Sequence, residues 1–231
     1  MIKELIEYFS TEVSPLAKQF KLLQQSIAIK KRYDRCKLHW QSHLENCHHV
    51  IQEELNVIKP KHVLVLGSGH LLETPLALFS DVQKLTLIDF VFPNSVRKKT
   101  NKDSRIQLIE MDLTGLLEQL KNFAFPIPKS IEIGESPDLV ISANIASQLP
   151  IHPISYLTDP NNRFANRYSD EQLVELAKNL ILNHIDLLKK FKHSLLISDY
   201  QKIIKNHRTN SVEEFPTLLG VPFSPFRSWD W

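Results

Sequence analysis

The sequence predicts an α/β fold: an open, mostly parallel, doubly wound sheet with a helical N-terminal cap and a shortened C-terminal hairpin. From Lys61 onward, short apolar runs alternate with amphipathic segments, which is the pattern of βαβ units. Residues 1–58 contain no glycine and one proline, and their apolar residues recur at helical spacing. We therefore divide the chain into a helical cap, residues 1–58, and a Rossmann-like sheet domain, residues 59–231.

Five apolar runs are expected to form the strands, at residues 62–66, 84–88, 105–109, 138–142 and 194–198. Between them we expect helices at residues 75–79, 95–100, 113–123 and 170–191, and two or three further helices in the cap. The helix at 170–191 has the clearest start, because Ser169 and Gln172 form a capping box. The strands lack strict alternation, as expected where helices cover both faces of a parallel sheet.

Composition excludes several classes of protein. The chain has 231 residues, 42% of them hydrophobic, so it can build a core and is not largely disordered. A net charge of +2 gives no reason to expect nucleic acid or an anionic membrane as partner. The two cysteines, Cys36 and Cys47, cannot form a disulfide framework, and the N-terminus lacks the pattern of a signal peptide. No apolar run approaches the ~18 residues of a membrane span, so we expect a cytoplasmic protein.

A glycine turn follows the first predicted strand. Gly67 and Gly69 allow a sharp turn and the close approach of a ligand to the main chain. The next strand ends in Asp89, roughly 20 residues further on, the spacing at which a carboxylate accepts hydrogen bonds from ribose hydroxyls. Asp112, after the third strand, stands where an acid can accept from an adenine amino group. The alternative is a tight turn beside a solvated aspartate.

The third glycine of the dinucleotide fingerprint is missing, since Leu72 stands at its position. That glycine permits close packing of helix and strand over a pyrophosphate. NAD is therefore disfavoured relative to a nucleotide cofactor that lacks a diphosphate. An NAD-dependent oxidoreductase ranks third among the functions considered.

With these motifs, residues 60–200 resemble the class I S-adenosylmethionine-dependent methyltransferases, and more closely an uncharacterised bacterial branch of them. The resemblance rests on these segments: Val63-Leu-Val-Leu-Gly-Ser-Gly69 with Glu73, Leu87-Ile-Asp89, Glu110-Met-Asp-Leu113, Asp138-Leu-Val-Ile-Ser-Ala-Asn144 and Leu195-Leu-Ile-Ser-Asp199. The branch also has a basic helix carrying a Trp and a His, here Arg32, Arg35, Trp40 and His43. The resemblance implies S-adenosylmethionine as the cofactor.

The resemblance also implies roles for individual residues. Gly67, Ser68 and Gly69 would line the methionine end and the ribose, and Asp89 would hold the ribose hydroxyls. Phe90 would flank the adenine, and Asp112 and Leu113 would meet its edge. Asn144 would lie beneath the methionine portion, near the transferring methyl group.

The methyl acceptor is expected to be a small molecule. Methyl transfer is an in-line displacement, so positioning of the nucleophile matters more than strong acids and bases. We therefore assign orientation of the reactants to Asn144, Gln148 and His152. No Asn/Asp-Pro-Pro-Tyr signature follows the fourth strand, which keeps open a non-catalytic relative that acts as a binding or scaffold protein. A homodimer is also left open.

Residues 149–168 are expected to form a loop at the ligand edge, acting as a lid or a substrate loop. Arg163 and Arg167 within it could fix an anionic substrate through their guanidinium forks. His152 is the best-placed titratable group in this loop.

A helical face in the cap carries Cys36, His39, His43 and Cys47. These four span about 16 Å of helix and cannot all meet one metal ion, so no metal site is predicted. We expect instead that the helix covers the cofactor edge, with His43 or Trp40 reaching the pocket.

Overall fold

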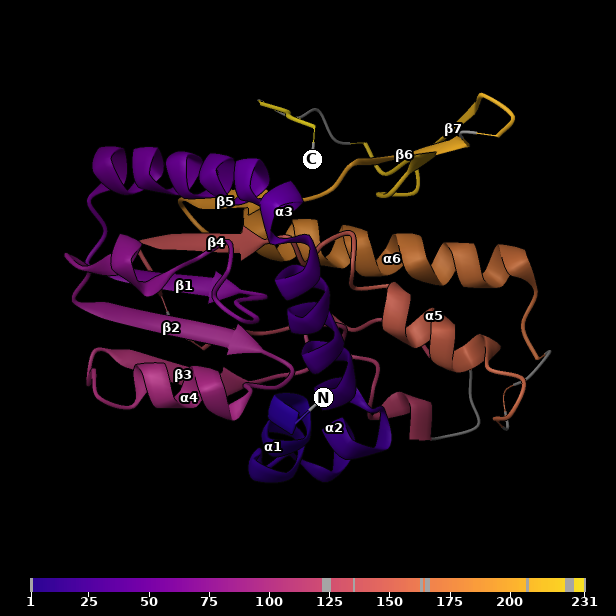
Figure 1. The fold of residues 1–231 in the computed structure, drawn as a ribbon, viewed down its shortest axis with the longest axis horizontal. Helices are drawn as coiled ribbons and strands as arrows, with labels where there is room; N and C mark the ends of the chain where they lie inside the picture. Colours follow the sequence, from indigo (N-terminus) through magenta and orange to yellow (C-terminus); the bar gives the residue numbers. More distant parts are fainter. Residues whose placement is uncertain are drawn as a thin grey trace.

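The computed structural model describes residues 2–121, 126–134, 136–162, 164, 167–206, 208–222 and 227–230. In this part of the chain, five parallel strands form one sheet in the order β3-β2-β1-β4-β5. Their bounds are β1 His62–Leu66, β2 Lys84–Asp89, β3 Ile106–Glu110, β4 Leu139–Ala143 and β5 Ser194–Ile197. The predicted α/β class and the five predicted strands are confirmed (Figure 1).

The register brings the carboxyl ends of the strands to one edge. Val65 of β1 lies opposite Leu87 of β2 and Ile141 of β4, so these strands end almost level. The strand order reverses between β1 and β4. In open parallel sheets ligands bind at such a reversal, beyond the carboxyl ends.

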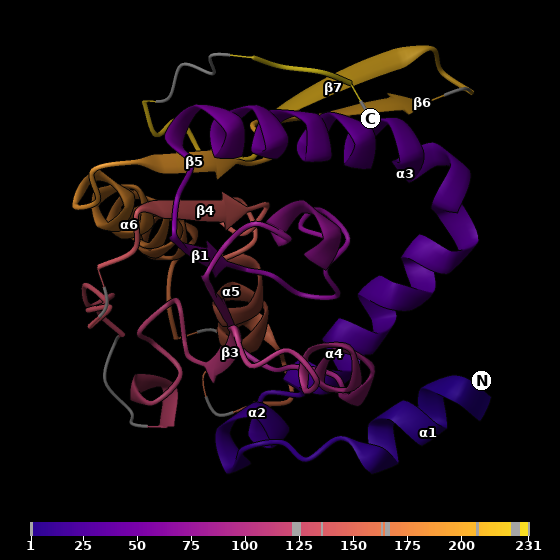
Figure 2. The same cartoon turned by 90° about the vertical axis from the view of Figure 1, so that its left-hand side faces the viewer.

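Both faces of the sheet are buried, because helices and loops pack on each of them. Successive strand residues point to opposite faces. On one face, Leu64 and Leu66 pack with α6 (Asp170–Lys189) and with residues 113–120. On the other face, Val63 and Val65 pack with the second half of α3 (Leu22–Ile58) and with α4 (Asn94–Thr100). Figure 2 shows these helices on the two sides of the sheet.

Three helices form the N-terminal region, namely α1 (Ile2–Ser10), α2 (Pro15–Gln19) and α3. A kink at Cys36, where φ is −110° and ψ is 20°, divides α3 into two halves. The first half runs past the carboxyl edge of the sheet, and the second half lies over one face (Figures 1 and 2). The cap therefore contributes to the hydrophobic core as well as covering the edge.

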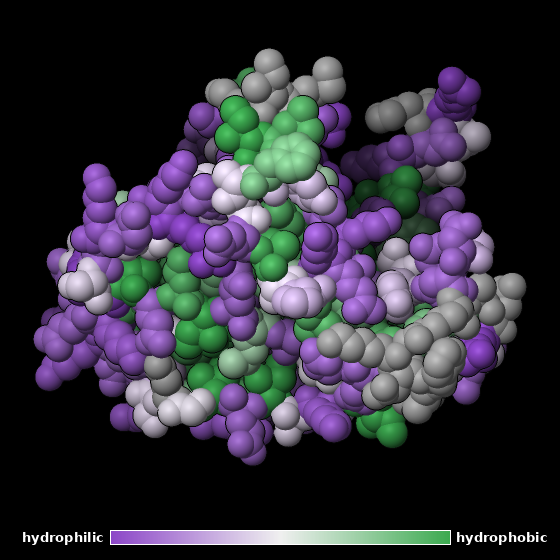
Figure 3. All heavy atoms as spheres, turned by 90° about the horizontal axis from the view of Figure 1, so that it is seen from below, coloured by the Kyte–Doolittle hydropathy of each residue, from purple (hydrophilic) through white to green (hydrophobic). Residues whose placement is uncertain are grey.

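Part of the N-terminal surface is apolar. Leu5, Ile6 and Phe9 of α1 are exposed. Figure 3, which views the molecule from the side of α1 and α2, shows apolar side chains gathered among polar ones. No helix in the described ranges has the length and apolar character needed to cross a bilayer.

The predicted helices have different outcomes. The capping box at Ser169 and Gln172 is confirmed, and α6 begins at Asp170. At residues 75–79 the structure has only a 3₁₀ turn, η1 (Leu76–Phe79). The predicted helix at 113–123 was wrong over its described part, which consists of turns and the 3₁₀ turn η2 (Gln119–Lys121), and residues 122 and 123 lie outside the described residues.

The C-terminal hairpin forms, but apart from the main sheet. Its strands, β6 (Gln201–Asn206) and β7 (Ser211–Pro216), pair with each other in a separate two-stranded sheet. Beyond the hairpin, Leu218 and Val221 are buried against α6. Residues 227–230 return to the second half of α3, where Trp229 packs on the core.

Candidate functional site

The glycine turn lies at the carboxyl end of β1. Gly67 has a φ of +75°, and a Cβ there would lie 2.6 Å from Cβ of Ile145. Gly67 is therefore required both by its backbone conformation and by the space available. At Gly69, where φ is +49°, a Cβ would instead stand 3.9 Å from Oδ2 of Asp89, in the space in front of that carboxylate.

Asp89 ends β2 and faces this turn. Its Oδ2 accepts a hydrogen bond from the Gly69 N–H at 2.7 Å, and its Oδ1 accepts from the Phe90 N–H at 2.7 Å. Burial raises the pKa of Asp89 to about 6, while the N–H groups of Gly69, Phe90 and Val91 lower it. The carboxylate is thus fixed in orientation, and lone-pair capacity remains on it for a further donor.

Asp112 is engaged by its own loop. Its Oδ1 accepts from the Thr114 N–H at 2.8 Å, and its Oδ2 accepts from the Leu117 N–H at 2.7 Å. Leu113 is buried in the core, whereas Phe90 is half-buried beside Asp89. Of the residues expected around the adenine, Leu113 is therefore enclosed, whereas Phe90 and Asp112 are both half-buried. Contact with adenine stays a prediction for all three.

The two halves of α3 each hold the loop that follows the glycine turn. His70 donates from Nε2 to the Ser26 carbonyl oxygen at 2.7 Å, and His48 donates from Nε2 to the Leu72 carbonyl oxygen at 2.8 Å. Leu71 is buried in the core although its φ is +61°. The loop is therefore clamped to the cap from two points.

A buried polar cluster lies at the exits of β4 and β5. Asn144 follows β4 with a φ of +55°, and its Oδ1 accepts from the Asp199 N–H at 3.4 Å. Its side chain also hydrogen-bonds the carboxylate of Glu73, from the clamped loop. Burial raises the pKa of Glu73, and the negative charge of Asp199 raises it further.

His43 joins this cluster from α3. Trp229 donates from Nε1 to Nδ1 of His43 at 3.2 Å, so the proton of the neutral ring is on Nε2. That Nε2 lies 3.9 Å from Oε1 of Glu73 and 3.5 Å from Sγ of Cys47. Burial lowers the pKa of His43 to about 4, which keeps the imidazole neutral at physiological pH.

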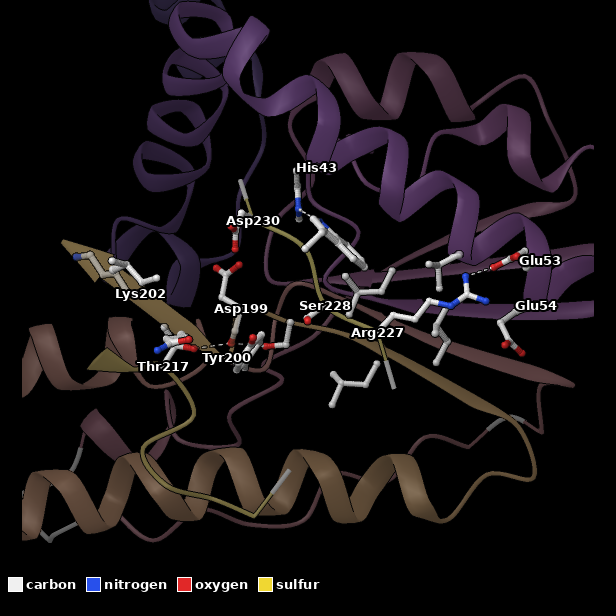
Figure 4. Close-up of a pocket in the computed structure, with 18 of the residues that line it drawn as sticks. His43, Glu53, Glu54, Asp199, Tyr200, Lys202, Thr217, Arg227, Ser228 and Asp230 are labelled. Carbon is white, nitrogen blue, oxygen red and sulfur yellow. Dashed lines mark hydrogen bonds and ion pairs between the residues drawn. The ribbon is translucent and has the colours of Figure 1, made fainter. Parts of the chain in front are cut away.

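A cavity of about 710 Å³ opens beside the cluster (Figure 4). Its walls come from the second half of α3, the edge strand β5, the start of β6 and residues 227–230. His43, Asp199, Tyr200, Trp229 and Asp230 line it. The cavity therefore reaches the polar cluster through His43 and Asp199.

Gln148 precedes α5 (Ile151–Thr158), and His152 belongs to the first turn of this helix. Gln148 is half-buried and takes part in a turn through its N–H to the Ile145 carbonyl oxygen. His152 donates from Nε2 to the Phe20 carbonyl oxygen at 2.6 Å and contacts the Phe20 ring. Neither residue lines the cavity.

Residues 149–168 are not an irregular loop, because they contain α5. Phe20, Tyr156, Phe164 and Tyr168 form consecutive ring contacts, and Phe164 is fully buried. The segment is thus packed against the cap. Arg163 lies outside the described residues, and whether Arg167 meets a substrate stays a prediction.

Sequence reasoning identified one half of this site better than the other. It expected His43 or Trp40 to reach the cofactor pocket, which stays a prediction, and His43 lines the separate cavity beside β5. It gave no site role to Asp199 or Trp229. The signal for Asp199 was available, since it directly follows the fifth strand as Asp89 ends the second. Among the described residues, no group of three or more His, Cys, Asp or Glu side chains is arranged to hold a metal ion.

Comparisons with protein-family models, curated proteins and solved structures found no match to this chain.

Proposed function

We propose that this protein is an S-adenosylmethionine-dependent methyltransferase of the class I type, acting on a small molecule. The observation that carries the proposal is the carboxylate of Asp89, held by the Gly69 and Phe90 N–H groups beside the glycine turn. It stands at the carboxyl edge, close to the reversal of strand order, where an open parallel sheet binds its ligand.

The residues present fit this cofactor. In the proposal, Asp89 accepts from the ribose hydroxyls, and Gly69 leaves the space in front of the carboxylate open. Ser68 is buried within the turn. In the proposal, the main chain of Gly67, Ser68 and Gly69 meets the methionine end and the ribose of the cofactor. Phe90 offers a half-buried ring to the adenine.

When bound, S-adenosylmethionine supplies a methyl group on a sulfonium ion that a nucleophile can displace. The chain contributes orientation and exclusion of water. Asn144 is fixed by the Asp199 N–H and by Glu73, and its chain neighbours Ala143 and Ile145 lie against Gly67. In the proposal, its amide is thereby held in one orientation beneath the methionine portion. In the proposal, Gln148, just before α5, and His152, within it, help to orient the reactants.

Calorimetry with S-adenosylmethionine, S-adenosylhomocysteine and NAD tests the proposal. We expect both sulfur compounds to bind and NAD not to bind. Asp89→Ala should weaken S-adenosylhomocysteine binding by about 1.5–3 kcal/mol, the range for hydrogen bonds to a charged group. The matched control is Asp103→Asn, because Asp103 pairs with Arg105 on the surface away from the turn.

Absence of binding of either sulfur compound at millimolar concentration would overturn the proposal. Binding without transfer of a labelled methyl group to any acceptor would instead favour the non-catalytic alternative.

A further inference from the structure

The short helix α1 exposes its apolar side chains to solvent. The exposed fractions of Leu5, Ile6 and Phe9 are 56%, 61% and 79%. These three positions fall within about 100° around the helix axis, so they form one stripe. Figure 3 shows apolar side chains gathered on this side of the molecule. A surface helix normally turns such a stripe toward the core, so the stripe of α1 is left for a partner outside the chain.

The acidic side chains of α1 face the protein instead. Glu4 forms an ion pair with Lys31 of α3, with 3.8 Å between Oε2 and Nζ. Glu7 accepts through Oε1 from the Ser95 N–H of α4 at 2.9 Å. These two contacts fix the rotation of α1 about its own axis. The apolar stripe therefore cannot turn into the core unless both contacts break.

An aromatic pair supports the most exposed side chain of the stripe. The rings of Tyr8 and Phe9 meet edge to face, with 5.3 Å between their centroids. The Tyr8 hydroxyl in turn accepts a hydrogen bond from Nε2 of Gln24 on α3 at 3.3 Å. Phe9 is thus held in an outward position by a neighbour that is itself bonded to the cap.

Basic residues are concentrated in the two helical segments beside α1. Residues 28–35, at the end of the first half of α3, contain four basic residues and one acid. Residues 94–102, in and just beyond α4, contain four basic residues and no acid. Figures 1 and 2 both show α1 next to α4 and to the first half of α3. The net charge of +2, on which the expectation of no membrane partner rested, conceals this concentration.

The two basic segments converge at α1. Burial lowers the pKa of His70, the positive charges of Lys30 on α3 and Lys99 on α4 lower it further, and the Glu7 carboxylate of α1 opposes them. One imidazole therefore lies within electrostatic range of all three helices. The ion pair of Asp34 with Lys30 offsets the one acid of the α3 segment. The exposed basic side chains of the two segments are Lys31, Arg32, Arg35, Lys98, Lys99 and Lys102.

We propose that α1 docks in the plane of an anionic lipid membrane. Leu5, Ile6 and Phe9 enter the headgroup region, and the basic residues of α3 and α4 contact lipid phosphates. Interfacial helices combine an apolar stripe with lysines and arginines in this way, and they do not cross the bilayer. A nucleic acid would match the positive charge but leave the apolar stripe uncovered. This surface is independent of the proposed function.

Sedimentation of the full chain with vesicles tests the proposal. The vesicles consist of phosphatidylcholine alone or with about one quarter of phosphatidylglycerol, an anionic surface on the order of that of a cytoplasmic leaflet. We expect roughly twentyfold or stronger binding to the anionic vesicles, because each basic residue near such a surface contributes about a factor of five. Equal binding to both vesicles would overturn the proposal. So would no binding at about 5 mM lipid, well above the ~0.1 mM at which marginal anchors bind.

Apolar variants locate the contact on α1. Ile6→Ser and Phe9→Ser should each weaken binding to the anionic vesicles roughly tenfold, because less apolar surface leaves water. Both side chains are exposed, so the variants should fold, as circular dichroism will show. Val57→Ser is the matched control, because Val57 is 80% exposed at the end of α3, away from α1. Unchanged vesicle binding in Phe9→Ser would contradict the assignment.

Charge variants test the basic flank. The double variant Lys98→Gln/Lys99→Gln should weaken binding to anionic vesicles roughly tenfold and leave binding to neutral vesicles unchanged. Lys202→Gln/Lys205→Gln removes the same charge from β6, on the separate hairpin, and serves as the control. Equal losses in the two double variants would show that net charge alone directs binding, which would overturn the place assigned to it.

A second copy of the chain is the competing occupant of the stripe. Analytical ultracentrifugation without lipid distinguishes it. A dimer that Phe9→Ser abolishes, in a protein that does not bind anionic vesicles, would overturn the membrane assignment. Vesicle binding is measured without S-adenosylhomocysteine, so its outcome and that of the cofactor calorimetry are read separately.

Discussion

The two ends of the ligand edge are built differently. At β1 and β2, the main chain fixes Asp89 through the N–H groups of Gly69 and Phe90. At β4 and β5, side chains from separate segments meet: His43, Glu73, Asn144, Asp199 and Trp229. The first end is therefore defined by a local turn, whereas the second depends on how distant segments pack. A ligand common to many proteins suits the first, and a ligand particular to this protein suits the second.

The largest effect is expected from removing the cap, because both ends depend on α3. A chain beginning at Lys59 loses Cys47, Ile51 and Leu55 from the core and should aggregate or fail to fold. Solubility and circular dichroism measure this. A chain lacking only residues 2–10 should fold, since α1 leaves most of its apolar side chains exposed. A well-folded chain from Lys59 would show that the sheet domain is independent of the cap.

The next largest effect is expected on stability, where substitutions at the two glycines of the turn should differ. Gly67→Ala should lower the free energy of unfolding by about 2–5 kcal/mol, from backbone strain plus the clash with Ile145. Gly69→Ala should cost only about 1–2 kcal/mol, because its Cβ meets no atom closer than 3.9 Å. Urea denaturation measures both values. Equal losses would show that space around Gly67 is not limiting.

A buried hydrogen-bonded pair outside the site provides a reference for the energetic contribution of buried polar contacts. Ser142 of β4 and His184 of α6 form a hydrogen bond of 2.8 Å, and burial lowers the pKa of His184 to about 4. Ser142→Ala should cost about 1–3 kcal/mol, because it leaves Nε2 of His184 without this partner. The double variant Ser142→Ala/His184→Leu should recover part of that loss.

Two buried histidines, His43 and His184, make the stability of the folded protein depend on pH. His43 and His184 have lowered pKa values in the folded protein, so the stabilisation is present above pH 6.5 and is lost as the pH falls toward 4. Denaturation at a series of pH values measures this, and the double variant should show a smaller loss. A pH dependence unchanged in the double variant would contradict the role of His184.

The smallest expected effect is on cofactor affinity. The pKa of Asp89 is about 6, raised from 3.8, and ribose hydroxyls donate best to the ionised form. S-adenosylhomocysteine should therefore bind roughly tenfold more weakly at pH 5 than at pH 7. In Asp89→Asn the affinity should be lower and independent of pH over this range. A wild-type affinity that rises on acidification would exclude Asp89 as the ribose acceptor.

The sequence predicted the sheet well because each strand is a short apolar run between turns. It failed at residues 113–123, where the leucines have helical spacing and are buried without forming an α-helix. Gly115 has a φ of +63° there, and Asp112 caps a turn. Apolar spacing thus reported burial rather than helix.

The missed helix α5 has a different cause. Pro150 and Pro153 fall within the segment expected to be a loop, but they occupy the N-cap and the first turn of α5, where a missing N–H costs nothing. The cluster at β4 and β5 was missed as a group for a third reason, although Asp199 by itself had a signal in the sequence. Its members are brought together by the kink in α3 and the return of the C-terminal segment, and neither leaves a local pattern.

The kink at Cys36 gives the two ends of the ligand edge a common element. The first half of α3 binds the loop after the glycine turn through Ser26, and the second half carries His43 to the cavity. A ligand that steadies this helix at one end lowers the ordering cost for a ligand at the other. Linkage then requires reciprocity: the factor by which the first ligand tightens the second equals the factor by which the second tightens the first.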